Sequence, residues 1–236
     1  MTKNLDNEGL RSIVESYDFF FIDLWGVIHN GITLHKNAIK TLTEISNTKK
    51  NYVLLTNAPR PNNTVKMFLK KMGMDKSILE KVYTSGEAAL NYLKKNHLNE
   101  KFYHIGPPRD FDLFLDFKEK KKKNINECNY FLCTGLFDKY DQDLNYYKKL
   151  FSGFISKKMI CTNPDLVVDR GKKREFCAGS VAKICPRPTE KSRHCTTMRT
   201  QTRENRSTQT QLSDKTPTLH YRPLPCQNKK PSETLP

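Results

Sequence analysis

Short apolar runs alternate with amphipathic segments along the first 184 residues of the chain. The runs predict short buried β-strands at residues 19–28, 52–56, 82–84, 102–105, 130–133 and 159–161. Apolar residues at helical spacing predict helices between the strands, through Ala38, Leu42 and Ile45 and through Val65, Phe68, Leu69 and Met72. Strands that alternate with helices at this pace are typical of a parallel sheet with crossover helices. The pattern therefore predicts an α/β, Rossmann-like fold.

The composition changes abruptly near residue 185. All ten Gly and all thirteen Phe lie before it, and seven of the twelve Pro lie after it. Residues 185–236, called the tail below, contain no Ala, Val, Ile, Phe or Trp, and carry ten Lys or Arg against four Asp or Glu. Such a segment buries too little apolar surface to offset the entropy of ordering it. We expect the tail to be disordered.

Charge and apolar content argue against several classes of partner. The net charge of +16 is spread over the predicted helices and loops, so nucleic-acid binding is only a minor alternative, through tail residues Arg187, Arg193, Arg199, Arg203 and Arg206. No run approaches the roughly 20 apolar residues of a membrane span, and the polar N-terminus lacks a signal-peptide core. We therefore expect no membrane partner.

The seven cysteines suggest a reducing compartment. Their number is odd, they form no Cys-x-x-Cys pair, and several lie in apolar segments. They are expected to be reduced core thiols of a cytoplasmic protein. Zinc binding by Cys185, His194, Cys195 and Cys226 is not favoured, because their spacing fits no common zinc motif.

Candidate chemistry lies where the predicted strands end. In open α/β sheets, ligands bind beyond the carboxyl ends of the strands. The first strand delivers one carboxylate, Asp23, into a glycine turn. Burying an ionised carboxylate costs several kcal/mol without a partner or metal, so Asp23 is a candidate nucleophile or metal ligand. The alternative is that Asp23 only caps the turn.

The second and third strands end on hydroxyl and amide side chains. Thr56 and Asn57 precede a helix, where a hydroxyl and outward backbone N–H groups suit a phosphate. Ordinary turn chemistry is the alternative for this pair. At the third strand end, capping of a helix by Thr84 or Ser85 is the favoured interpretation.

These segments resemble the motifs of one protein family. Residues 23–31, DLWGVIHNG, and 55–60, LTNAPR, resemble the first two motifs of haloacid-dehalogenase (HAD) superfamily hydrolases. Residues 83–88, 161–165 and 177–180 resemble further landmarks of the capped class IIA branch. The resemblance implies a HAD-like parallel core with an inserted α/β cap. Residues 1–95 would form the N-terminal part of the core, residues 96–184 the cap region and the start of the return to the core, and residues 185–236 a basic tail foreign to the fold.

The resemblance also implies a reaction, the hydrolysis of a small phosphorylated metabolite. Asp23 would be the nucleophile that forms an aspartyl-phosphate, and would share Mg²⁺ with the backbone carbonyl of Trp25. Gly26, Thr56 and Asn57 would hold the phosphate oxygens. From the cap, Asp165 or Arg170 would contact the substrate, with salt bridging in a loop as the alternative for both. The oligomeric state is not predicted.

Two departures from the family pattern weaken the expectation of activity. Trp25 stands where most phosphatases of the superfamily carry a second Asp, which acts as the general acid and base. His29 is the nearest titratable candidate to replace it, although a surface-loop histidine is the favoured interpretation.

The second departure is the abrupt end of the resemblance after Ile184. The phosphate-binding Lys and the acidic metal-binding motif that the family places later have no match. Such a change is typical of a frameshifted reading or a join to unrelated sequence, so the core is expected to be incomplete at the C-terminus and its activity doubtful. The alternative function is a catalytically inactive phosphate- or nucleotide-binding protein.

Overall fold

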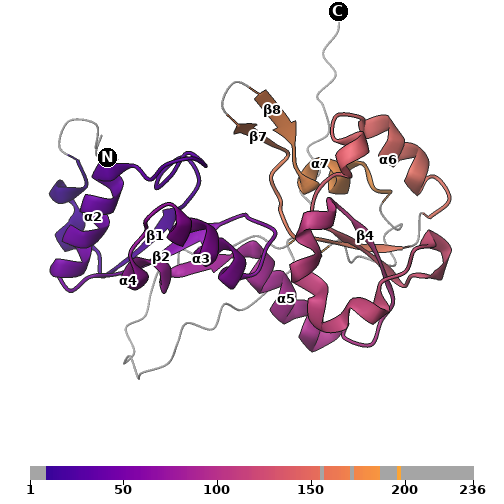
Figure 1. Ribbon diagram of the computed structural model, residues 1–236, viewed down its shortest axis with the longest axis horizontal. Helices are drawn as coiled ribbons and strands as arrows, with labels where there is room; N and C mark the ends of the chain where they lie inside the picture. The colour runs from indigo at the N-terminus through magenta and orange to yellow at the C-terminus, as the bar shows by residue number, and fades with distance from the viewer. Residues whose placement is uncertain (1–8, 155–156, 171–172, 187–195, 198–236) are drawn as a thin grey trace, which may run out of the picture. The chain divides into compact units, whose positions relative to one another are not determined.

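The computed structural model describes residues 9–154, 157–170, 173–186 and 196–197 (Figure 1). The strands are β1 Phe19–Asp23, β2 Asn51–Thr56, β3 Val82–Thr84, β4 Phe102–Ile105, β5 Tyr130–Cys133, β6 Lys158–Cys161, β7 Val167–Arg170, β8 Lys173–Phe176 and β9 Thr196–Thr197. The α-helices are α2 Lys36–Asn47, α3 Asn62–Lys71, α4 Lys76–Leu79, α5 Ser85–Asn96, α6 Leu144–Phe151 and α7 Ala178–Ile184. The 3-10 helices are η1 Leu10–Ser12, η2 Val14–Ser16, η3 Pro108–Lys120, η4 Ile125–Glu127 and η5 Asp138–Tyr140.

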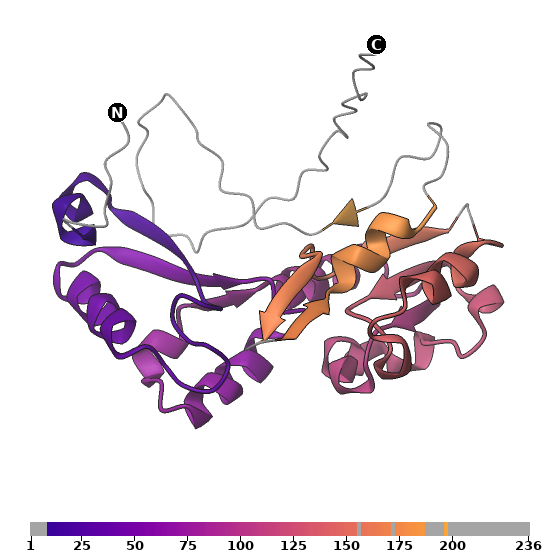
Figure 2. The same cartoon turned by 90° about the horizontal axis from the view of Figure 1, so that it is seen from above.

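The first sheet has the order β1-β2-β3, and all of its pairs are parallel. The register places Asp23 opposite Leu55 and Thr56 opposite Thr84. Helices α2, α3 and α4 cover one face, as Figure 2 shows for the first two. The buried residues on this face are Leu42, Ile45, Tyr52, Leu54, Val65, Leu69, Ile78, Leu79 and Val82. The predicted helices at residues 38–45 and 65–72 are thus confirmed.

The opposite face of the first sheet is largely open. The side chains of Phe19 and Phe21 are 40% and 55% exposed. The prediction of a buried strand over residues 19–28 is wrong on two counts, because β1 is an edge strand exposed on one face and it ends at Asp23. Its apolar composition is typical of a strand in the interior of a sheet. Among the described residues, however, β1 pairs with a strand on one side only.

The second sheet has the order β4-β5-β6-β9, again with parallel pairs. Helices α6 and α7 pack on one face, and α5 with η3 packs on the other. Every residue of β5 is therefore buried. Two parallel sheets covered by helices confirm the predicted α/β class.

Two smaller features complete the described part of the chain. Strands β7 and β8 form an antiparallel hairpin that the sequence pattern did not predict. Cys128, Cys133, Cys161, Cys177 and Cys185 are buried and form no disulfide, in agreement with the expectation of reduced core cysteines. No helix in the described ranges is both long and apolar enough to cross a membrane.

The tail falls almost entirely outside the described residues. Of the nucleic-acid and zinc candidates in it, only Cys185 is described, so both alternatives stay untested. Strand β9, which pairs with β6, is the other described part of the tail beside Cys185 and Pro186. The proposed division at residues 95 and 184 also stays a prediction.

The two faces of β2 predict a difference in stability. Leu54 is fully buried under the helices, whereas its neighbour Leu55 points to the open face and is half-buried. Leu54→Ala should lower the free energy of unfolding by about 2–5 kcal/mol, and Leu55→Ala by about 1 kcal/mol. Urea unfolding followed by circular dichroism measures both. Equal losses would show that the open face is covered in solution.

Candidate active site

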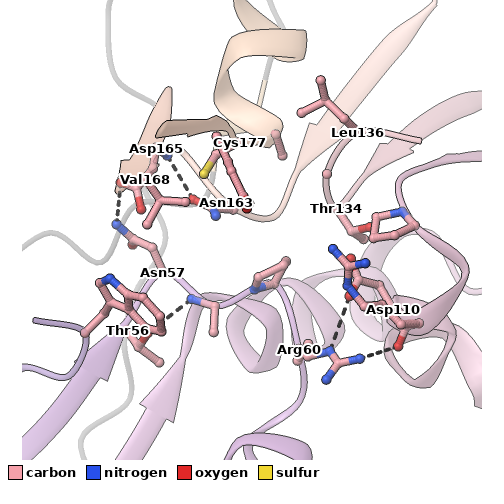
Figure 3. A pocket seen from close by; sticks show the side chains of 18 of the residues that line it. Thr56, Asn57, Arg60, Asp110, Thr134, Leu136, Asn163, Asp165, Val168 and Cys177 are labelled. Atoms are coloured by element: carbon pink, nitrogen blue, oxygen red, sulfur yellow. Dashed lines mark hydrogen bonds and ion pairs between the residues drawn. The ribbon is translucent and has the colours of Figure 1, made fainter. Parts of the chain in front are cut away.

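The parallel register brings the predicted site residues to one edge of the first sheet. Asp23 ends β1 and Thr56 ends β2, on neighbouring strands that run in the same direction. Both line a cavity of about 770 Å³, together with Trp25, His29 and Asn57. Figure 3 shows Thr56 and Asn57 facing this cavity from the side of the first sheet.

Asp23 is held by the backbone that follows it. The N–H of Leu24 donates to Asp23 Oδ1 at 2.8 Å. The side chain of Asp23 lies on the open face of the edge strand and is exposed. The argument that a buried carboxylate demands a partner therefore does not apply to Asp23. Its candidacy rests instead on its place at the cavity.

A tight turn follows β1 and folds back on itself. The N–H of Gly26, whose φ is 78°, donates to the carbonyl of His29 at 2.8 Å. Gly26 is not among the residues that line the cavity, so the structure does not bring it to Asp23 and Thr56 as expected. Gly31 has a φ of 89°, and a Cβ there would lie 2.5 Å from the Trp25 ring. Only glycine allows the indole to pack on this turn.

His29 is a buried residue of this turn and not a surface histidine. It is 4% exposed. Its Nδ1 accepts the N–H of Gly31 at 3.0 Å. The ring meets the rings of Trp25 and Phe68 edge-on, at centroid distances of 5.2 Å and 5.9 Å. Burial, helped by the nearby His35, lowers the pKa of His29 below its usual value.

Phe68 corrects a second expectation. It belongs to the apolar stripe of α3, yet it is 42% exposed and lines the cavity beside His29. Val65 and Leu69 of the same stripe are buried. The stripe thus serves both the core and the site.

The loop after β2 joins the two sheets. Thr56 is 8% exposed, and its hydroxyl oxygen accepts the N–H of Ala58 at 3.3 Å. Asn57 Nδ2 donates to Asp165 Oδ1 at 2.9 Å, across 108 residues of sequence (Figure 3). Asp165 lies in the loop after β6 and lines the cavity, and its contact with a substrate stays a prediction. The side chain of Arg170 is not among the described ones.

Sequence reasoning missed a polar chain on the other side of the cavity. Arg60 Nε donates to Asp110 Oδ1 at 3.3 Å, and Arg60 also donates to the carbonyl of Arg109. Asp110 is 4% exposed and is bonded to Thr134, whose hydroxyl meets His104 Nε2 at 2.9 Å. Figure 3 shows Arg60, Asp110 and Thr134 together at this wall.

Burial determines the protonation states of Asp110 and His104 in this group of polar side chains. It raises the pKa of Asp110, although the bonds from Thr134 and Arg60 oppose the shift. It lowers the pKa of His104 to about 3, so the imidazole is neutral at physiological pH. The sequence contained a signal for these residues. Asp110 and Thr134 come after the apolar runs of β4 and β5, much as Asp23 comes at the end of the apolar run of β1.

The donor set at the sheet edge suits a hard divalent cation. Asp23 supplies a carboxylate and Trp25 a backbone carbonyl, and both are oxygen donors. Within the described ranges, no group of three or more His, Cys, Asp or Glu side chains could hold a metal. Mg²⁺ is commonly bound through one or two carboxylates with waters and substrate phosphate. The residues fit such an open site in the kind of ligand they provide.

Comparison with known proteins supports the resemblance of the motifs at this sheet edge. Residues 20–117 match the family described as haloacid dehalogenase-like hydrolase. This match confirms the resemblance of the motifs to that family. The phosphoglycolate phosphatase 2 of Arabidopsis thaliana is similar to the chain, with 32% identity over 110 residues.

Solved structures extend the likeness beyond that match. A hydrolase of the haloacid dehalogenase-like family from Brucella suis superposes with a TM-score of 0.66 at 29% identity, over 76% of this chain and 67% of that one. A glycerol phosphate phosphatase from Mycobacterium tuberculosis, solved with magnesium, has the same fold, with a TM-score of 0.52 at 18% identity over 75% of this chain and 55% of that one. The match to the plant phosphatase covers 43% of this chain and 35% of that protein.

The neutral His104 predicts a pH-dependent stability. Below about pH 6.5 the unfolded chain binds a proton at this histidine, whereas the folded chain does not until its pKa of about 3. Stability is therefore lost as pH falls. Between pH 7 and pH 5, the free energy of unfolding of the wild type should fall by about 2 kcal/mol more than that of His104→Gln. Urea unfolding of both proteins at the two pH values tests this, and a constant difference would contradict it.

Proposed function

We propose that the protein is a Mg²⁺-dependent phosphomonoester hydrolase that acts on a small phosphorylated metabolite through an aspartyl-phosphate intermediate. The observation that carries the proposal is the meeting of Asp23 and Thr56 at one sheet edge, in the wall of one cavity. The match of residues 20–117 to the haloacid dehalogenase-like hydrolase family supports it. The magnesium complex of the mycobacterial phosphatase supports the choice of ion.

Asp23 performs the chemical step. The bond from Leu24 N–H fixes Asp23 Oδ1, which leaves Oδ2 to attack phosphorus. As the bond between Oδ2 and phosphorus forms, the bond from phosphorus to the leaving oxygen breaks, and water later cleaves the aspartyl-phosphate. Asp23 and the Trp25 carbonyl would hold a Mg²⁺ ion, which when bound would supply positive charge to neutralise the phosphoryl oxygens.

The phosphoryl group is held by donors that the described contacts leave available. Thr56 accepts from Ala58, and its hydroxyl hydrogen is bonded to none of the described residues. That hydrogen can serve a phosphate oxygen. The backbone N–H of Asn57 is the further proposed donor, whereas the Gly26 N–H, which the resemblance also implied, donates to the His29 carbonyl.

The size of the cavity favours a small substrate. A volume of about 770 Å³ lies within the range of roughly 300–1,000 Å³ that ligand pockets span. Polar side chains are among those that line the cavity, including Asp110, Thr134 and Asp165. Such walls suit a leaving group that carries hydroxyl groups. Free buried thiols support the further proposal that the protein works in the cytoplasm.

The second candidate function is a catalytically inactive protein that binds phosphate or a nucleotide. Trp25 favours it, because the indole stands where most relatives carry their general acid and cannot exchange a proton at neutral pH. The same cavity and the same hydroxyl of Thr56 would serve binding alone.

Substitution of Asp23 separates the two functions. Asp23→Asn keeps the size and the Leu24 bond but removes the nucleophile, so Mg²⁺-dependent hydrolysis of an aryl phosphate should fall by at least about 10³-fold. Thr56→Val should lower the same rate by about 10²-fold, because the hydroxyl donor is lost. The measurement is release of the phenol at saturating substrate, with and without a chelator.

Matched controls keep the result interpretable. Asp18→Asn changes the same side chain just before β1 and outside the cavity lining, and should leave the rate unchanged. Turnover by Asp23→Asn equal to wild type would refute the nucleophile. Phosphate binding without any Mg²⁺-dependent turnover of the wild type would establish the second function.

A further inference from the structure

We propose that His29 is a further catalytic residue, whose neutral ring donates a hydrogen bond from Nε2–H to the leaving oxygen of the substrate. This inference rests on the proposed function, and it assigns to His29 part of the work that a carboxylic acid at position 25 would otherwise do. It is carried by the placement of His29, by its fixed tautomer and by its unused donor.

The first step is the position of His29 beside the nucleophile. Its backbone N–H donates to the Leu24 carbonyl at 3.3 Å, and its own carbonyl accepts the Gly26 N–H at 2.8 Å. His29 is therefore tied to the two residues that closely follow Asp23 in the turn. The His29 side chain and Asp23 line the same cavity.

The second step is the tautomer. His29 Nδ1 accepts the N–H of Gly31 at 3.0 Å, so it cannot carry a hydrogen while that bond is kept. The ring hydrogen of the neutral imidazole must then be on Nε2. The edge-on contacts with Trp25 and Phe68 hold the plane of the ring, which fixes the direction of that hydrogen.

The third step is that this donor has no partner among the described residues. None of them forms a hydrogen bond with His29 Nε2. The residue is only 4% exposed, its side chain lines the cavity, and Nε2 is not one of the sealed polar atoms. A nearly buried donor without a partner is unfavourable. A ligand in the cavity would satisfy it.

The chemical role follows from where charge develops. When Asp23 attacks phosphorus, negative charge grows on the departing oxygen as its bond to phosphorus breaks. A preorganised N–H donor stabilises that charge without giving up its proton. The departing oxygen takes its proton from solvent water, and His29 begins and ends neutral.

The dependence of rate on the leaving group tests this role. Wild type and His29→Phe would be compared with Mg²⁺ on a series from nitrophenyl phosphate through phenyl phosphate to an alkyl phosphate. Phe keeps an aromatic ring beside Trp25 and Phe68 and removes the donor. The loss in kcat should be small for the nitrophenyl ester and should grow to about 10²-fold for the alkyl ester.

A conservative variant and a second measurement separate donation from packing. His29→Gln restores an N–H near the position of Nε2, so part of the alkyl ester activity should return. Asp18→Asn, at a residue outside the cavity lining, should behave as wild type. In the unligated wild type, ring nitrogen NMR shifts should report the Nε2–H tautomer, which tests the geometry without turnover.

Each outcome decides between the two levels of the proposal. An equal loss for every leaving group in His29→Phe, or an Nδ1–H tautomer, would overturn the role of His29 and leave the phosphatase standing. A wild type without Mg²⁺-dependent turnover would overturn the proposed function and the role of His29 together. A loss of kcat in His29→Phe that grows with the basicity of the leaving group, with partial rescue in His29→Gln, establishes the role of His29.

Discussion

The parallel pairing of β1 with β2 is the constraint on which the candidate site depends. In-register pairing from Phe19 with Asn51 to Asp23 with Leu55 makes both strands end together. A shift by one residue would turn Asp23 to the helix-covered face, because side chains alternate along a strand. The apolar residues of α2 and α3 select the register, since only one face of β2 can bury Leu54 beneath them.

A second constraint is that the walls of the cavity also hold the two sheets together. Five side-chain hydrogen bonds between described residues cross between them, from Asn57 to Asp165, Arg60 to Asp110, Arg60 to the carbonyl of Arg109, Thr64 to Asp112 and Ser85 to the carbonyl of Thr162. Four of these bonds begin in the segment that leads from β2 into α3. The loop after β2 and the region of the second sheet are thus linked through polar groups, and a change in one alters the position of the other.

The fold could be predicted where local pattern and tertiary environment agree. Strand β5 is apolar throughout and is buried by helices on both faces, so its sequence determined its place. Phe21 has the same apolar character, but its exposure depends on what pairs with an edge strand, which local pattern does not report. The β7–β8 hairpin has charged, short strands without alternation. In the site, Asp23 and Thr56 were found as polar ends of apolar strands, whereas the bond between Arg60 and Asp110 depends on contacts 50 residues apart.

Buried donors around the cavity fall into two groups, and the difference separates structure from function. Thr84 donates to the Arg60 carbonyl at 2.6 Å and accepts from Glu87 as a helix cap, so its hydroxyl is fully used within the fold. Thr56 and His29 each accept one backbone N–H and keep a hydrogen that the described residues do not bind. Folding gains nothing from an unused buried donor, because desolvation is unfavourable unless a partner replaces water. Thr56, His29 and the carboxylate of Asp23 line one cavity, and the phosphate of the proposed substrate is the partner that would offset the cost of the two donors.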